Sequence, residues 1–172
     1  MAGNLEFIKS ASGTSVSSLS ITDCFNANYD VYQVLIAKSD VSAEDYSVLR
    51  LIDSGGSVIT AGEYDWAELG MYSYTTFAQN KNTNSTAISN IDVSATSTAQ
   101  GIGTMFYVFN PFDSSSYTFV AGQTSGVVTA GLAGGKYISV HKSAEQITGI
   151  QLLRASGDYD NLTVKVFGLA SN

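Results

Sequence analysis

The sequence predicts an all-β protein, specifically an antiparallel β-sandwich of jelly-roll type with about nine or ten short strands. Short runs of alternating apolar and polar residues recur along the chain and are separated by turn-forming Gly, Ser, Asn and Asp. No long segment has a helical period. Only 13% of the 172 residues are charged, and Ser, Thr, Asn and Gly fill the gap. We expect residues 1–172 to form a single domain with one core.

The expected strands follow one another along most of the chain. They cover residues 5–9, 16–22, 31–37, 46–52, 104–109, 117–121, 126–130, 136–140, 147–154 and 161–169. The run over 31–37 is apolar on both faces, which predicts a central strand. Glycines 55 and 56 follow the run over 46–52 and predict a hairpin into Val58, because glycine tolerates the positive φ of tight turns. The only proline, Pro111, ends the run over 104–109.

The last two runs are the clearest. Leu162, Val164 and Val166 alternate with polar residues, and Ile150 and Leu152 alternate with Gly149 and Gln151. The six residues between these runs are rich in Gly, Asp and Ser. We therefore expect a closing hairpin. By contrast, the segment from Gln79 to Gln100 is rich in Asn, Ser and Thr and predicts a long surface loop.

The charge and the cysteine content argue against several classes of protein. A net charge of −7 and a pI near 4.4, with only eight Lys and Arg, argue against nucleic-acid binding and against an anionic membrane. No apolar run is long enough to span a bilayer, and the first residues lack a basic and apolar signal segment, so we expect a protein that is neither inserted in a membrane nor exported by the usual route. Cys24 is the only cysteine and is expected to be a buried apolar side chain.

Residues typical of catalysis are few. His141 is the only histidine, which removes most triads and imidazole metal sites, and it is interpreted as an ordinary surface or strand-end side chain. We therefore expect no enzyme activity, no catalytic residues, no metal and no cofactor. A hydrolase that uses Glu63, Asp65 or Glu68 remains an alternative, because glycosidases need two facing carboxyl groups.

Aromatic residues concentrate between Tyr64 and Phe77, close to those carboxylates. Tyr and Trp rings stack on sugars, and carboxylates bond their hydroxyl groups. The candidate ligand-binding residues are Tyr64, Trp66, Glu68, Tyr72 and Tyr74. The alternative is that these aromatic side chains occupy core or subunit-interface positions, since Tyr72 and Tyr74 alternate with Ser73 and Thr75.

Two segments carry a resemblance to a known family. Residues 12–22 form a Ser-rich strand, followed by Cys24-Phe-Asn, by Tyr29-Asp-Val-Tyr32 and by an apolar strand to Ala37. Residues 147–152 and the run from Ser156-Gly157 to Leu169 form the second segment. Both resemble small β-sandwich virion structural proteins of tailed bacteriophages, marine phages especially. The resemblance covers about a third of the chain and transfers no catalytic residue.

The resemblance implies a non-enzymatic virion structural protein, made in the bacterial cytoplasm and exposed on the phage particle as a head decoration or tail-associated component. Its partners would be capsid or tail proteins and further copies of itself, because packing between copies covers sheet edges. The oligomer we expect is a symmetric trimer. The alternative is a receptor- or glycan-binding module for host attachment. Its recognition surface would combine residues 63–77 with the segment 79–100 and would bind a host surface glycan.

Overall fold

The computed structural model describes residues 4–93 and 102–170, and in these ranges the chain contains eleven strands and no helix. The strands are β1 (Leu5–Gly13), β2 (Ser18–Ile21), β3 (Val31–Val41), β4 (Ser47–Asp53), β5 (Tyr64–Tyr72), β6 (Ala78–Ser85), β7 (Ile102–Phe109), β8 (Thr118–Val128), β9 (Gly131–His141), β10 (Ile147–Arg154) and β11 (Tyr159–Leu169). The all-β prediction is confirmed, with slightly more strands than expected. No helix of the described ranges could cross a bilayer.

The strands form two antiparallel sheets that pack face to face. The large sheet has eight strands in the order β1-β11-β3-β7-β8-β9-β5-β6, and the small sheet has three in the order β2-β10-β4. Consecutive strands cross repeatedly from one sheet to the other, whereas β5-β6 and β7-β8-β9 connect neighbours within the large sheet. These crossovers give the sandwich its jelly-roll character.

The core lies between the two sheets. It is built from alternate residues, because successive side chains of a strand point to opposite faces. Its largest fully buried side chains include Tyr32, Tyr64, Tyr159, Phe106, Leu49 and Ile150. The central position predicted for residues 31–37 is confirmed, since β3 lies between β11 and β7.

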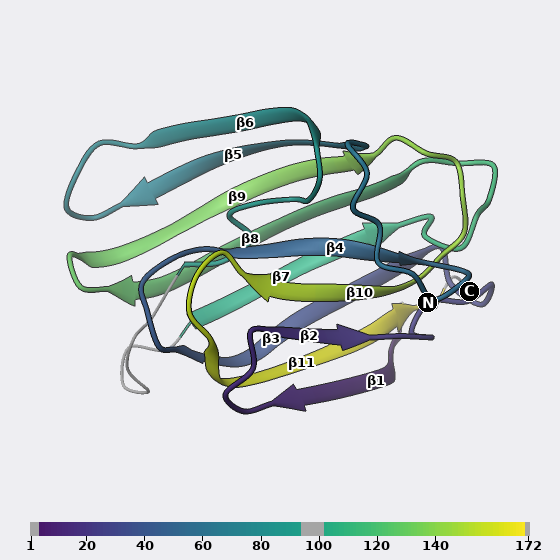
Figure 1. Ribbon diagram of the computed structural model, residues 1–172, viewed down its shortest axis with the longest axis horizontal. Coiled ribbons are helices and arrows are strands. Elements are labelled where there is room, and N and C mark those ends of the chain that lie inside the picture. The colour runs from purple at the N-terminus through teal and green to yellow at the C-terminus, as the bar shows by residue number, and fades with distance from the viewer. Residues whose placement is uncertain (1–3, 94–101, 171–172) are drawn as a thin grey trace.

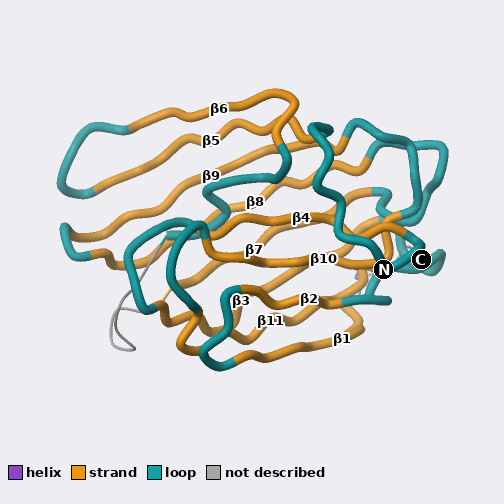
Figure 2. Tube along the Cα trace, viewed as in Figure 1, coloured by secondary structure: helices purple, strands orange, loops and turns teal. Residues whose placement is uncertain are grey.

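The two sheets differ in extent, and this difference exposes part of the inner face. The small sheet lies over the β3, β7 and β11 region, whereas β5 and β6 extend beyond it (Figure 1). The ends of the described chain lie close together, because the Ala170 N–H donates to the Asn4 carbonyl at 3.1 Å. The tube view shows that long loops connect the margins of the two sheets (Figure 2).

The predicted closing hairpin is wrong. β10 pairs with β2 and β4, whereas β11 pairs with β1 and β3. The turn between them, with Gly157 at φ 68°, carries the chain across the sandwich. The alternation of apolar residues is present as expected, but the two buried faces contribute to opposite walls of one core.

The predicted long loop over residues 79–100 is also wrong in its first part. Residues Ala78–Ser85 form β6, an edge strand whose side chains are almost all exposed and which therefore has no apolar alternation. Ile88 and Ile91 then enter the core. Residues 94–100 lie outside the described residues.

Smaller differences concern strand lengths. The runs predicted over 117–121 and 126–130 belong to a single strand, β8, with a turn after Val128. The predicted turn before Val58 is present, with Gly56 at φ 82°, but the pairing that follows is a single bridge between Ile52 and Val58. β5 was not among the expected strands, although it carries most of the candidate site residues.

Candidate functional site

A cleft of about 280 Å³ is lined by residues of β5 and β6, by the loop before β4 and by the segment around Asn90. Three of the predicted ligand-binding residues, Glu68, Tyr72 and Tyr74, line it. Glu68 and Tyr72 share the inner face of β5, since they lie four residues apart on a strand. The cleft therefore brings together the carboxylate and the two tyrosines that the sequence singled out.

Two tyrosine rings form the aromatic wall of the cleft. The ring centroids of Tyr72 and Tyr74 are 5.5 Å apart, with the planes tilted by 54°. The Tyr72 side chain lies over Gly70, where an added Cβ would be 2.7 Å from the Tyr72 hydroxyl. Gly131, at φ 137°, makes similar room for Tyr74, since a Cβ there would be 3.0 Å from the ring. Glycine at these two positions leaves the space that the two rings occupy.

Polar groups surround the two rings. Glu68 pairs across the strands with Asn80 of β6, and the Asn80 amide donates to the Glu68 carboxylate at 3.3 Å. Glu44 enters from the loop before β4 and accepts hydrogen bonds from the Thr129 hydroxyl and, at 2.7 Å, from the Thr129 N–H. These bonds lower the pKa of Glu44, with the hydroxyl contributing most, so Glu44 is an ionised acceptor at neutral pH.

The electrostatics of Tyr72 follow from its surroundings. Burial raises the pKa of Tyr72 above its ordinary value, and the nearby Glu68 and Tyr74 raise it further. The phenol therefore stays neutral at physiological pH and can both donate and accept hydrogen bonds. The cleft thus offers an aromatic surface, a neutral hydroxyl, carboxylates and a carboxamide within one small volume.

A buried polar network holds the loop that carries Glu44. The Asp92 carboxylate accepts from the Ser47 N–H at 2.8 Å and from the Ser47 hydroxyl at 2.7 Å. The Arg154 guanidinium donates to the Asp45 carbonyl at 2.7 Å and to the Ala43 carbonyl at 3.1 Å. Burial raises the pKa of Asp92, whereas its hydrogen bonds with Ser47 and the charge of Arg154 lower it. The network fixes the 43–47 backbone against β10.

Tyr64 and Trp66, the other two predicted site residues, lie elsewhere. Tyr64 is fully buried, and its hydroxyl accepts from the Leu51 N–H at 3.1 Å and donates to the Ile59 carbonyl at 3.2 Å. Trp66 is half-buried and packs against the core. It lines a separate hollow with Phe119 and Ile138. For these two aromatic residues the structure shows the core environment that was weighed as the alternative.

The only cysteine of the sequence and its only histidine are both buried. Cys24 is fully buried, as expected, and burial raises the pKa of its thiol to about 12. His141 lies at the end of β9, as the strand-end interpretation expected, but the surface interpretation is wrong because the residue is only 1% exposed. Its ring packs against the Tyr64 ring, with centroids 5.2 Å apart and the planes tilted by 43°.

The three carboxylates considered for a hydrolase, Glu63, Asp65 and Glu68, lie in three different places in the structure. Asp65 points to the outer face of the large sheet and forms an ion pair with Lys142 at 2.8 Å. Glu63 contacts the His141 ring, with Glu63 Oε2 3.2 Å from His141 Nε2. Glu68 alone lies in the cleft.

Sequence reasoning missed several residues of the cleft. Asn80 and Asn90 lie in the segment that was expected to contribute to recognition, so their region was anticipated although its structure was not. Glu44 and Tyr46 were not anticipated. They precede an ordinary predicted strand, and nothing in their local pattern indicates that the loop reaches β5.

Comparisons with known proteins add little. No family model and no curated protein matches the chain. Among solved structures, the chain is similar to a prokaryotic β-1,3-1,4-glucanase (lichenase) from a mouse hindgut metagenome, with a TM-score of 0.32, 16% identity and coverage of 90% of this chain and 79% of that one. It is also similar to the CBM2 module of the evolved Dit of Lactobacillus casei BL23 phage J-1, with a TM-score of 0.23, 10% identity and coverage of 93% and 75%. Both TM-scores are below 0.5, so neither similarity carries an argument about function.

Proposed function

We propose that this protein is a non-enzymatic glycan-binding module carried on a bacteriophage particle, where it contributes to host attachment. The observation that carries the proposal is the cleft beside β5 and β6, with Tyr72 and Tyr74 set against Glu68. Sugar rings present C–H faces that pack on aromatic rings, and hydroxyl groups that bond carboxylates and amides. The placement on a phage particle is supported by the family resemblance of residues 12–37 and 147–169.

The rigidity of the cleft supports binding. Glu68 and Tyr72 lie on a strand that is paired on both sides, and Glu44 is held by hydrogen bonds to Thr129. Groups held in place before binding lose little conformational entropy when a ligand arrives. A small and open cleft of this kind fits one or two sugar units at the surface of a longer glycan.

A glycan array followed by calorimetry on the best glycan tests the proposal. The Tyr74→Ala variant removes a ring that is 44% exposed, so its effect on folding should be small. We expect this variant and Glu68→Gln to bind at least roughly tenfold more weakly than the wild type, as for other central contact residues. Tyr117→Ala is the control, because Tyr117 is 47% exposed but lies outside the cleft.

Three outcomes would contradict the proposal. One is a wild type that binds no glycan on arrays that include host cell-wall and surface polysaccharides. Another is an equal effect of Tyr74→Ala and Tyr117→Ala on affinity. Release of reducing ends from a bound polysaccharide, lost in Glu68→Gln, would instead establish the hydrolase alternative.

A second candidate function, a structural virion subunit, is favoured by the outer face of the large sheet. Apolar side chains there are unusually exposed: Ile138 by 66%, Phe7 by 59% and Leu132 by 55%. Exposed apolar surface of this kind is typical of protein interfaces. We propose that copies of this chain associate through this face, which leaves the cleft on the inner face free.

A further inference from the structure

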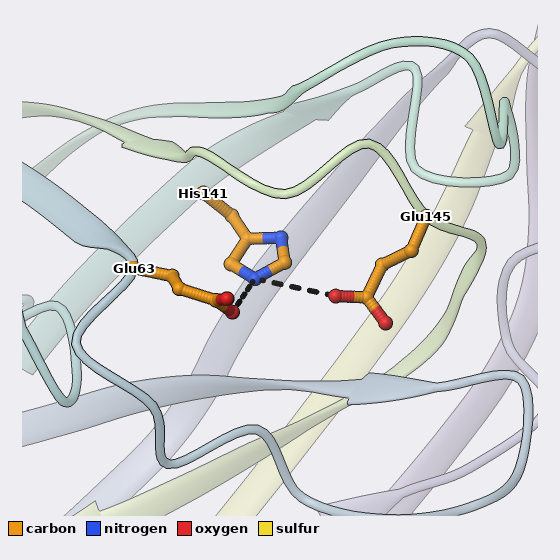
Figure 3. Close-up of side chains that lie close together, drawn as sticks. All are labelled: Glu63, His141 and Glu145. Carbon is orange, nitrogen blue, oxygen red and sulfur yellow. Dashed lines mark hydrogen bonds and ion pairs between the residues drawn. The ribbon is translucent and has the colours of Figure 1, made fainter.

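Glu63, His141 and Glu145 form a cluster, here called the His–Glu cluster (Figure 3). His141 Nε2 lies 3.2 Å from Glu63 Oε2 and 3.6 Å from Glu145 Oε1. One ligand atom from each residue lies within 4.8 Å of the other two. Both carboxylates face the same ring nitrogen (Figure 3).

The strand pairing explains how the cluster forms. Tyr64 of β5 is the register partner of His141 of β9, so Glu63, one residue earlier, comes beside the histidine. The Lys142 N–H donates to the Glu63 carbonyl at 2.8 Å and fixes this backbone. Glu145 lies in the connection from β9 to β10, which the Ile147 N–H ties to the Pro111 carbonyl at 2.7 Å. Three backbone segments therefore meet at one point.

We propose that the His–Glu cluster binds a divalent transition-metal ion, with Zn²⁺ the best match. Zn²⁺ binds imidazole nitrogen and carboxylate oxygen at about 2.0–2.2 Å, so two of its tetrahedral ligands lie about 3.4 Å apart. The two distances to His141 Nε2, 3.2 and 3.6 Å, bracket this separation. The imidazole favours a transition metal over Ca²⁺ or Mg²⁺, which prefer oxygen ligands alone.

Charge supports a divalent ion. The carboxylates of Glu63 and Glu145 carry two negative charges, which one divalent ion balances. The nearby Lys142 is already paired with Asp65 at 2.8 Å and also donates to Asn84 at 2.7 Å. Like charges held this close repel strongly where water is partly excluded, so a cation between them is favourable.

Access supports the site as well. The His141 side chain is fully buried, whereas the side chains of Glu63 and Glu145 are 39% and 34% exposed. An ion can therefore enter from the side of the two carboxylates, and burial keeps the His141 ring in one orientation. Three protein ligands leave a fourth position for water or another ligand. Bound there, the ion would tie the start of β5 and the end of β9 to the connection that enters the small sheet.

The site does not depend on the proposed glycan cleft. Glu63 and Tyr72 are nine residues apart along an extended strand, a separation of about 30 Å. Metal binding and glycan binding can therefore fail independently, and each is measured by its own titration.

Calorimetric titration of the untagged, chelator-treated protein with Zn²⁺ tests the proposal. We expect one ion per chain in the wild type. The Glu63→Gln and Glu145→Gln variants should bind at least roughly tenfold more weakly, since even outer partners of a metal site contribute that much. Both residues are part-exposed, so the variants should fold. Glu6→Gln is the matched control, because Glu6 is an exposed carboxylate of β1 at the opposite edge of the large sheet.

A second measurement reports on His141 directly. The chain contains one histidine, so the ring nitrogens give a single pair of ¹⁵N resonances. We expect Zn²⁺ to shift the Nε2 resonance, and to raise the melting temperature by roughly 5–10 °C at a hundredfold excess over Kd. Absence of Zn²⁺ binding, unchanged ring resonances, or equal affinity in Glu63→Gln and Glu6→Gln would overturn the proposal.

Discussion

Tyr64 and Tyr72 show how one residue type takes two roles on one strand. Both point to the inner face of β5, eight residues apart. Tyr64 lies under the small sheet and is fully buried, whereas Tyr72 lies beyond it and lines the cleft. Their aromatic character was visible in the sequence. What separates them is the width of the opposing sheet, which no local pattern of β5 encodes.

The Tyr64 hydroxyl should therefore matter for stability and not for binding. In Tyr64→Phe the buried Leu51 N–H and Ile59 carbonyl each lose a partner. Leaving buried groups unpaired costs about 1–3 kcal/mol, so we expect the free energy of unfolding to fall by about that amount. Urea denaturation measures the change, and glycan affinity should stay at the wild-type value. Tyr117→Phe, at an exposed position, should shift stability by less than about 0.5 kcal/mol. A Tyr64→Phe variant as stable as the wild type would contradict the assignment of this hydroxyl.

At the scale of strands, the sequence predicts most of the strands but not always which strands pair with each other. Ile150, Leu152, Val164 and Val166 alternate as half-buried strands should, and all four are buried. Alternation with a period of two residues shows which face of a strand is buried. It does not show whether two successive strands pair with each other or lie in opposite sheets. β6 escaped prediction for another reason: an edge strand with both faces exposed needs no apolar residues, so its Asn-rich sequence looks like a loop.

The close approach of β10 to the end of β2 gives a test of strand packing. A Cβ at Gly149 would lie 2.4 Å from the Ile21 carbonyl oxygen, a backbone atom that cannot rotate away. We expect Gly149→Ala to lower the free energy of unfolding by about 1–3 kcal/mol, as overpacking does. Gly103→Ala in β7 is the control, because its nearest neighbour would be 3.7 Å away. Urea unfolding curves compare the two, and equal stabilities would show that β10 can shift to accept a methyl group.

At the scale of the whole molecule, the site depends on contacts between distant segments. The sequence predicted Glu68, Tyr72 and Tyr74 because their chemistry suits sugars, and the cleft unites them. Glu44 and Asn90 join them only through the folded chain. The His–Glu cluster was missed for the same reason: Glu63 and His141 are 78 residues apart and meet through the pairing of β5 with β9.

The outer face of the large sheet leads to a prediction about assembly. Ile138 is 66% exposed on β9, and we expect Ile138→Lys to place a charge in the interface between copies. The wild type should sediment as an oligomer, with a trimer expected, and the variant as a folded monomer with a somewhat lower melting temperature, because association stabilises the folded chain. Analytical ultracentrifugation measures the mass of each, and circular dichroism checks that the variant is folded. Ser54→Lys, in an exposed turn away from this face, should keep the wild-type mass, and a monomeric wild type would rule out this mode of assembly.

The position of β11 between β1 and β3 has a consequence for biosynthesis. β1 and β3 are made early, yet the partner that joins them is more than 100 residues further along the chain. Until β11 leaves the ribosome, both strands present unpaired backbone groups that can pair with another chain. Pairing over such sequence distances also slows folding. Expression at low temperature, or with chaperones that shield early strands, should therefore raise the soluble yield of this protein more than that of a sandwich built from local hairpins.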